Sequence, residues 1–328
     1  MKRGIAIVVI WALFAIAGVS LQNNYLVTVA TATAFLAVWG QSWNVLGGLS
    51  GNISLGHSMF VAIPAYVAVL LFQHSGLSPL LGALLGIAAA VVLAAVIGAA
   101  TLRLRGPYFS LATLAAGAVV LSLILHYDEI TGGPSGVAIS FATDAPEKLQ
   151  FTNVRAYYLI ALTLLAAVTL GLDMIKRSRL GYYIAAIKSS EEAAAAAGIR
   201  VAQVKVLAFC LSALLTSVGS VFYVFFIGFL DPNFLASLTL SVKIALIAVV
   251  GGTGFLIGPI VGAIFYETID AVANAYFGAA GGWDVMILGF SVVAIVMTDP
   301  RGLCAMAQSA WQSVRGRSQI RAVAASKP

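Results

Sequence analysis

Long runs of apolar residues alternate with short polar segments along almost the whole chain. A helix that crosses the hydrocarbon core of a bilayer needs about 20 mostly apolar residues. At that length, the pattern predicts an all-α polytopic membrane protein with about ten spans. The predicted spans cover residues 4–21, 25–46, 53–73, 79–101, 107–126, 156–175, 204–228, 237–256, 259–277 and 282–299.

The composition supports this class. Of the 328 residues, 61% are hydrophobic and only 9% are charged, which is more apolar surface than a soluble domain could cover. In a membrane protein, the meaning of the net charge of +6 depends on which side of the membrane the basic residues lie. We expect contact with membrane lipid and not with nucleic acid.

The basic residues give the orientation. With an even number of spans and the N-terminus in the cytoplasm, all but three of the 18 lysines and arginines lie on the cytoplasmic side. Lys148 and Arg155 fall outside, and Lys243 falls within a predicted span. Because cytoplasmic loops carry an excess of Lys and Arg, this arrangement predicts that both termini are cytoplasmic.

The same reading divides the chain into regions. We expect a transmembrane domain over residues 1–302, with a cytoplasmic loop at 176–204 and an external loop at 127–155, followed by a basic cytoplasmic tail at 303–328. The start of the chain, Lys2 and Arg3 before an apolar run, imitates a signal peptide. It lacks a small-x-small cleavage site and a further span follows closely, so we expect an uncleaved helix.

Residues 189–198, SSEEAAAAAG, form a hydrophilic stretch between two apolar runs. A serine can cap a helix, glutamates are favourable in its first turn, and alanines propagate it. Gly198 would then end the helix in a left-handed conformation. The pattern predicts a short exposed helix with a small, flat surface, which suits either a cleft on a partner protein or an amphipathic connector on the membrane surface.

This stretch resembles the coupling loop of ABC importer permeases. Glu192-Ala193-Ala194, three further residues and Gly198 match the EAA-x3-G core of that loop, although its later Ile-x-Leu-Pro part is missing. Other stretches resemble the branched-chain amino acid permeases, in particular the LivM-like half, in order between about residues 40 and 302. These are NVLGGLSGNISLGHSMFVAIPAYVAVLL, RLRGPYFSLATLA, TGGPSG and VVGGTGFLIGPIVGA.

The resemblance implies a fold similar to the type II importer class and a non-catalytic transport subunit of the bacterial inner membrane. Its expected partners are a second, LivH-like permease, two ATP-binding subunits and a periplasmic solute-binding protein. No cofactor is expected in this chain, because the partners bind the ATP. Relatives carry leucine, isoleucine and valine, or urea, amides or aromatic acids, so the solute stays open between these classes. The implied ATPase-coupling residues are Glu191, Glu192, Ala193, Ala194 and Gly198.

A glycine-rich junction separates the second and third predicted spans. Glycines let helices approach closely or let the backbone break beside a water-filled path. The polar side chains here could line a solute pathway, or they could satisfy backbone groups at the helix ends. The candidate pathway residues are Asn44, Gly47, Gly48, Asn52, Ser54 and His57.

Lys243, Glu267 and Asp270 fall inside predicted spans. A charge at that depth costs roughly 2.5–3.5 kcal/mol even on an insertion scale. Spans eight and nine form a hairpin, and counting outward from its turn places Lys243 at the depth of Glu267 or Asp270. We expect a structural pair between Lys243 and one of these carboxylates. The alternative is that these groups contact the solute or relay protons.

Several motifs are missing from the chain. It has no G-x4-GK[ST] phosphate loop, no G-x-S-x-G and no H-E-x-x-H, so no enzymatic function is predicted. The three histidines lack metal-ligand spacing, and the two cysteines lie far apart, so neither a metal site nor a disulfide is expected. Two function classes remain: an ABC importer permease, and a proton-coupled secondary transporter that uses Glu267 and Asp270.

Overall fold

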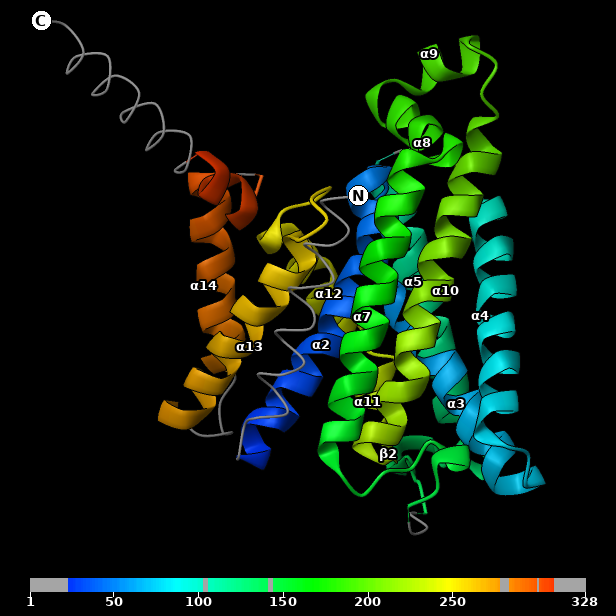
Figure 1. Cartoon of the computed structure of the whole chain (residues 1–328). Helices are drawn as coiled ribbons and strands as arrows, with labels where there is room; N and C mark the ends of the chain where they lie inside the picture. Colours follow the sequence, from blue (N-terminus) through cyan, green and yellow to red (C-terminus); the bar gives the residue numbers. More distant parts are fainter. Residues whose placement is uncertain (1–22, 103–105, 141–143, 278–282, 300, 310–328) are drawn as a thin grey trace, which may run out of the picture.

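The computed structural model describes residues 23–102, 106–140, 144–277, 283–299 and 301–309. In this part of the chain the architecture is a bundle of long helices, with short helices and loops at its two ends (Figure 1). The predicted first span, residues 4–21, and most of the predicted tail lie outside the described residues. Each of the other nine predicted spans corresponds to a helix, which confirms the all-α polytopic class.

One helix, α2 (Asn24–Asn44), is at the centre of the bundle. It packs against α7, α10, α12 and α13, and its Trp39 and Trp43 side chains are fully buried. On the far side of α10 lie α3 and α4, α5 packs against α3 and α4, and α14 packs on α13. The long helices around α2 are α3 (His57–Ser75), α4 (Pro79–Thr101), α5 (Pro107–His126), α7 (Val154–Arg177), α10 (Val201–Ile227), α12 (Leu238–Gly251), α13 (Gly258–Phe277) and α14 (Trp283–Thr298).

Six of the described helices are long and apolar enough to cross a bilayer, namely α2 with its extension to Leu49, α3, α4, α5, α7 and α10. α12 is apolar but has only 14 residues. At the α-helical rise of about 1.5 Å per residue, it is shorter than the hydrocarbon core.

The close packing of α4 follows from a stripe of small residues at a spacing of four. Gly82, Gly86, Ala90, Ala94 and Gly98 are all buried. A Cβ atom at Gly82 would lie 2.9 Å from the Ala68 carbonyl oxygen, and one at Gly86 would lie 2.8 Å from Pro64 Cα. This small-xxx-small pattern lets backbones approach closely, and it places α3 and α10 against α4.

The hairpin between α12 and α13 shows where one predicted boundary was wrong. The sequence predicts a span to residue 256, but α12 ends at Gly251. Gly252 and Gly254 take positive φ values of 119° and 81°, which terminate the helix early. The two helices then cross in close contact: a Cβ atom at Gly262 would lie 1.9 Å from the Ile247 carbonyl oxygen.

Shorter elements cover the end of the bundle that is opposite to α8 and α9 (Figure 1). Two residues from each of β1 and β2 pair antiparallel, with Val137 opposite Leu230. In the same region the Thr152 backbone N–H donates to the Asp144 carboxylate, which lowers the pKa of that carboxyl. The elements here are α6 (Asp128–Thr131), η2 (Gly133–Ser135), β1 (Val137–Ala138), η3 (Pro146–Lys148), β2 (Phe229–Leu230) and α11 (Pro232–Leu235).

Candidate functional site

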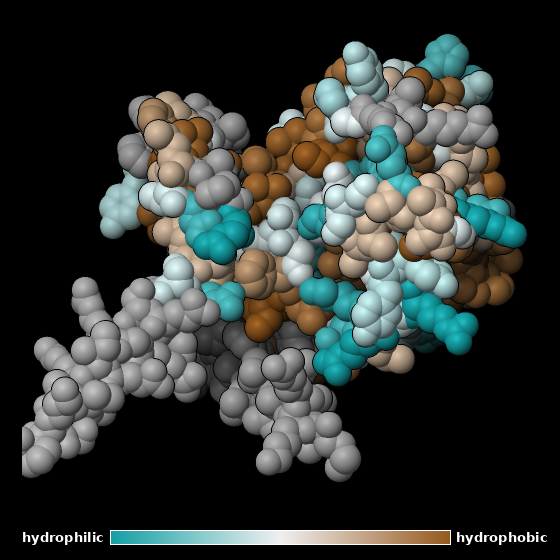
Figure 2. Space-filling view, turned by 90° about the horizontal axis from the view of Figure 1, so that it is seen from above, coloured by the Kyte–Doolittle hydropathy of each residue, from teal (hydrophilic) through white to brown (hydrophobic). Residues whose placement is uncertain are grey.

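Two short helices project from one end of the bundle, between the end of α7 and the start of α10 (Figure 1). They are α8 (Arg179–Ser189) and α9 (Glu191–Ala196), and Ser190 alone separates them. Figure 2 looks onto this end and shows hydrophilic residues gathered over the part of the bundle that carries them. The stretch with the EAA core is therefore exposed at an end of the bundle, as its sequence predicts.

Both ends of α9 are capped. The Ser190 hydroxyl accepts a hydrogen bond from the Ala193 N–H at 3.2 Å. At the other end Gly198 has φ +85°, its N–H donates to the Ala195 carbonyl, and the Ile199 N–H donates to the Ala194 carbonyl. This is the Schellman arrangement, which satisfies carbonyls at a helix end. The predicted left-handed stop at Gly198 is confirmed.

The faces of α9 differ sharply. Ala194 is buried against a cluster that also contains Ile184 and Ile187 of α8, whereas Ala193 and Ala195 are exposed. Glu191 forms an ion pair with Lys205, whose side chain is only 3% exposed. Glu191 is thus tied to α10, and Glu192 is the more exposed of the two glutamates.

The glycine-rich junction is an interruption of α2. Residues Val45–Leu49 form a π-helical turn, and Gly51 with φ +76° ends the run, so α3 starts at His57 and not near residue 53 as predicted. A Cβ atom at Gly47 would lie 2.2 Å from the Trp43 ring, which leaves space only for glycine. π-Helical turns are rare and are frequent at functional sites.

Most of the candidate pathway side chains bond within the chain. Asn44 accepts a hydrogen bond from the Gly254 N–H at 2.9 Å and donates to the Phe255 carbonyl at 3.0 Å. Asn52 donates to the Ser50 hydroxyl. Asn44 and Ser54 are buried. These residues hold the loop ends together, and their role in solute passage stays a prediction.

His57 is fully buried at the start of α3. Its Nε2 lies 2.8 Å from the Ser212 hydroxyl of α10, and its Nδ1 lies 3.1 Å from the Ser54 hydroxyl. Ser212 in turn donates to the Ser42 carbonyl of α2 at 2.6 Å. The histidine therefore lies at the point where α2, α3 and α10 meet.

The intramembrane charges meet between α12 and α13. Lys243 Nζ lies 3.7 Å from Glu267 Oε1 and 4.0 Å from the centre of the Tyr266 ring. Of the two expected partners, the structure pairs Lys243 with Glu267. Asp270 lies one helical turn further along α13 and is partly buried. The pair reduces the cost of placing either charge in the bilayer.

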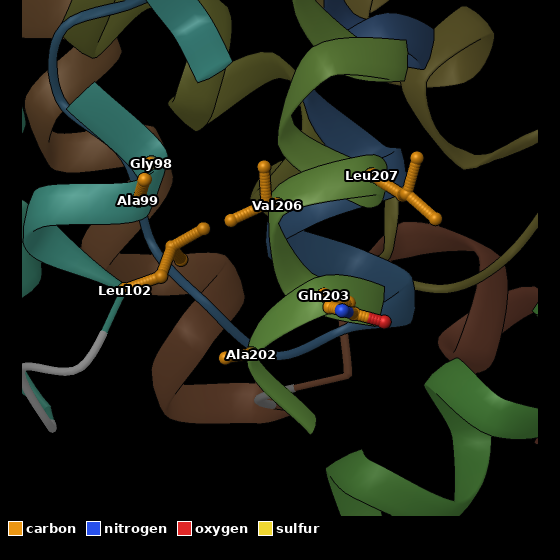
Figure 3. A pocket seen from close by; sticks show the side chains of 7 residues that line it. All are labelled: Gly98, Ala99, Leu102, Ala202, Gln203, Val206 and Leu207. Atoms are coloured by element: carbon orange, nitrogen blue, oxygen red, sulfur yellow. The ribbon is translucent and has the colours of Figure 1, made fainter. Parts of the chain in front are cut away.

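A shallow pocket of about 450 Å³ lies on the outside of the bundle, between α4 and α10 (Figure 3). Ala99 of α4 and Leu102 directly after it line the pocket opposite Val206 and Ala202 of α10, and Gln203 is its polar lining residue. The other lining residues that the structure describes are apolar or glycine.

Three lysines have roles that sequence reasoning missed, because it used them only to set topology. Lys205 pairs with Glu191, Lys188 donates to the Gly48 carbonyl, and Lys176 donates to the Gly254 carbonyl. The last two bonds join positions 140 and 78 residues apart, so no local spacing signals them.

The family comparison agrees with this architecture. A family model described as a branched-chain amino acid transport system permease component matches residues 25–296. The chain belongs to this family. It is thus a multi-pass membrane permease subunit of the ABC importer type.

The relatives of this permease carry different named solutes. It is 30% identical to the high-affinity branched-chain amino acid transport system permease LivM of Escherichia coli K12, over 85% of this chain and 70% of the relative. It is 29% identical to LivM of Salmonella typhimurium, over 89% and 73%. It is also 24% identical to the fructose import permease FruG of Bifidobacterium longum, over 76% and 75%. No solved structure matches the permease significantly.

Proposed function

We propose that this permease subunit imports branched-chain or other hydrophobic amino acids, and that separate ATP-binding subunits drive it through α9. The observation that carries the proposal is the form of α9. It is capped at both ends, exposes an alanine face, and is fixed to α10 by the Glu191–Lys205 pair. A rigid helix with a flat alanine surface fits a groove on a partner subunit. It then transmits a movement of that subunit into the bundle.

The proposed orientation places α8 and α9 in the cytoplasm. Lys188 and Arg200 lie at that end, and so does Arg301 after α14, whereas Asp128, Glu129 and Glu147 lie at the opposite end. The excess of positive charge on one side supports a cytoplasmic location for α9. Both termini then lie in the cytoplasm of a bacterium, and the opposite end receives a solute-binding protein.

The expected assembly contains a second, LivH-like permease, two ATP-binding subunits and a periplasmic binding protein. Closure of the ATP-binding pair would move the coupling helices, and the two permeases would alternate access to the pathway between them. The names of the LivM relatives support amino acids as the solutes. The fructose import permease among the relatives means that family membership alone does not determine the solute. Identifying the ligand of the cognate binding protein tests the solute directly.

The proposed role of α9 is tested at Gly198. None of the described residues lies within 4 Å of a Cβ atom placed there, so a substitution acts through the backbone. Gly198→Val adds a β-branched side chain in the left-handed region, at a cost of roughly 1–2 kcal/mol, whereas Gly198→Asn is tolerated there. We expect the valine variant to insert normally but to lose stimulated ATP hydrolysis in the assembled complex, and the asparagine variant to keep it.

Copurification with the ATP-binding subunit, and ATP hydrolysis in proteoliposomes, are the measurements. Equal stimulated activity in the Gly198→Val and wild-type complexes would contradict the proposal. Uptake driven by a proton gradient in vesicles that contain this chain alone would instead support a secondary transporter.

A further inference from the structure

The interrupted end of α2 is tied to the loop that contains α8 and α9. In a π-helical turn the regular hydrogen-bond ladder is disturbed, so carbonyl groups need other partners. At Gly48 the partner is Lys188, in the last turn of α8, whose Nζ donates to the Gly48 carbonyl at 2.6 Å. A Cβ atom at Gly51 would lie 3.5 Å from Lys188 Cγ, so the lysine stem runs along the break.

A second lysine, which precedes α8 in the sequence, reaches the loop between α12 and α13. Lys176, at the end of α7, donates through Nζ to the Gly254 carbonyl at 2.7 Å. The N–H of the same Gly254 donates to Asn44, at the end of α2. A Cβ atom at Gly48 would lie 2.7 Å from Gly254 N, so the two interrupted backbones are in direct contact.

Apolar packing makes this connection stiff. Ile184 and Ile187 of α8 and Ala194 of α9 belong to the same buried cluster as Leu46 of the π-helical turn and Phe60 of α3. The segment cannot shift relative to the break in α2 without disturbing this cluster. Bonds from cations to carbonyls are among the stronger hydrogen bonds, and the two lysines form them just before α8 and in its last turn.

We propose that Lys188 and Lys176 are positioning residues that transmit movement of α9 to the two interrupted backbones, at Gly48 in α2 and at Gly254 between α12 and α13. Asn44 joins these two points, so they move as one unit. The inference rests on the proposed docking role of α9. It adds the route by which movement of α9 reaches the membrane-spanning helices.

The test uses the assembled complex with its ATP-binding subunits. Hydrogen exchange is measured with and without a non-hydrolysable ATP analogue, in residues 189–200, 45–56 and 252–257. In the wild type we expect the analogue to change exchange in all three segments. In Lys188→Met and Lys176→Met we expect the change to remain in 189–200 and to be lost in the other two. Arg179→Met removes a positive charge from the first turn of α8 and is the matched control.

Radiolabelled leucine uptake and ATP hydrolysis are measured in proteoliposomes of the same variants. We expect leucine taken up per ATP hydrolysed to fall about fivefold or more in Lys188→Met, the lower range of measured coupling between sites. Lys188→Arg keeps a charged donor and should restore the ratio. A purely structural role would lower uptake and hydrolysis together and leave their ratio unchanged.

Two results would overturn the inference. One is a wild-type complex in which the analogue alters hydrogen exchange in residues 189–200 but not in residues 45–56. This result does not depend on the folding of any variant. The other is a Lys188→Met complex with an unchanged exchange response and an unchanged ratio of uptake to hydrolysis. Both leave the docking role of α9 intact, whereas failure of the ATP-binding subunit to copurify would reject the docking role itself.

Discussion

The central helix α2 and the peripheral helix α4 show opposite relations between polarity and burial. α2 with its extension is the least apolar of the six long spans, and 67% of its most apolar window is buried within the chain. α4 is the most apolar, and only 28% of its window is buried. In a bilayer the surroundings are as apolar as leucine, so polar groups gather where other helices can bond them. Of these two helices, the less apolar one is therefore the more buried.

The largest expected effect tests close packing in the interior. Gly262→Leu forces a side chain into the Ile247 backbone, where a Cβ atom would already lie 1.9 Å from the carbonyl oxygen. Overpacking usually costs about 1–3 kcal/mol, and contact with rigid backbone places this site at or beyond the upper limit. We expect loss of monodisperse protein in size-exclusion chromatography. Gly171→Leu is the control, because a Cβ atom at Gly171 meets nothing within 4 Å.

The next effect tests the charge pair between α12 and α13. Lys243→Met leaves Glu267 without its cation, and a carboxylate at this depth costs roughly 2.5–3.5 kcal/mol. We expect a clear fall in the thermal unfolding midpoint in detergent. The double variant Lys243→Met with Glu267→Gln should recover most of the loss. A single variant as stable as the wild type would reject a structural role for the pair.

A smaller effect is expected from the buried hydrogen bonds of His57. Ser212→Ala removes the hydroxyl that lies 2.8 Å from His57 Nε2, and an unsatisfied buried polar group costs about 1–3 kcal/mol. The comparison is Ser291→Ala, since the Ser291 hydroxyl donates to the Ile287 carbonyl one turn earlier in its own helix. Thermal unfolding should separate the two variants. Equal midpoints would show that the His57 contacts do not stabilise the bundle.

The smallest effect is expected on the periphery. Val92 of α4 is 62% exposed, so Val92→Ala exchanges one contact with lipid for another and should change stability by less than about 0.5 kcal/mol. Ala90, two residues earlier, is fully buried, and Ala90→Val should be the more destabilising change in the same assay. The reverse order would contradict the assignment of the two faces of α4.

The parts of the fold that local signals define were predicted well. α4 and α5 run over the predicted residues, because Ser78-Pro79 and Gly106-Pro107 mark their starts and uninterrupted apolar runs follow. The cap at Gly198 was also predicted, since a glycine after five alanines is typical of a left-handed residue that ends a helix.

The parts that depend on distant contacts were not predictable. The early end of α12 combines the positive φ values of Gly252 and Gly254 with the close crossing of α12 and α13, and the sequence shows the glycines but not the crossing. Depth alone placed Lys243 opposite both Glu267 and Asp270, because these lie one turn apart on one helix, whereas the folded structure places Lys243 Nζ 3.7 Å from Glu267 Oε1. The Lys188 and Lys176 bonds needed the folded arrangement of four segments.

The bonds between α3 and α10 have a consequence for biogenesis. His57 and Ser212 are 155 residues apart, and a ribosome adds about 5–20 residues per second. For roughly 8–30 s after His57 has been synthesised, its partner on α10 does not exist. During that time the polar face of α3 must be covered by water, by the translocon or by α2. The nascent protein therefore enters the membrane in an unfinished state, and the arrival of α10 completes its interior.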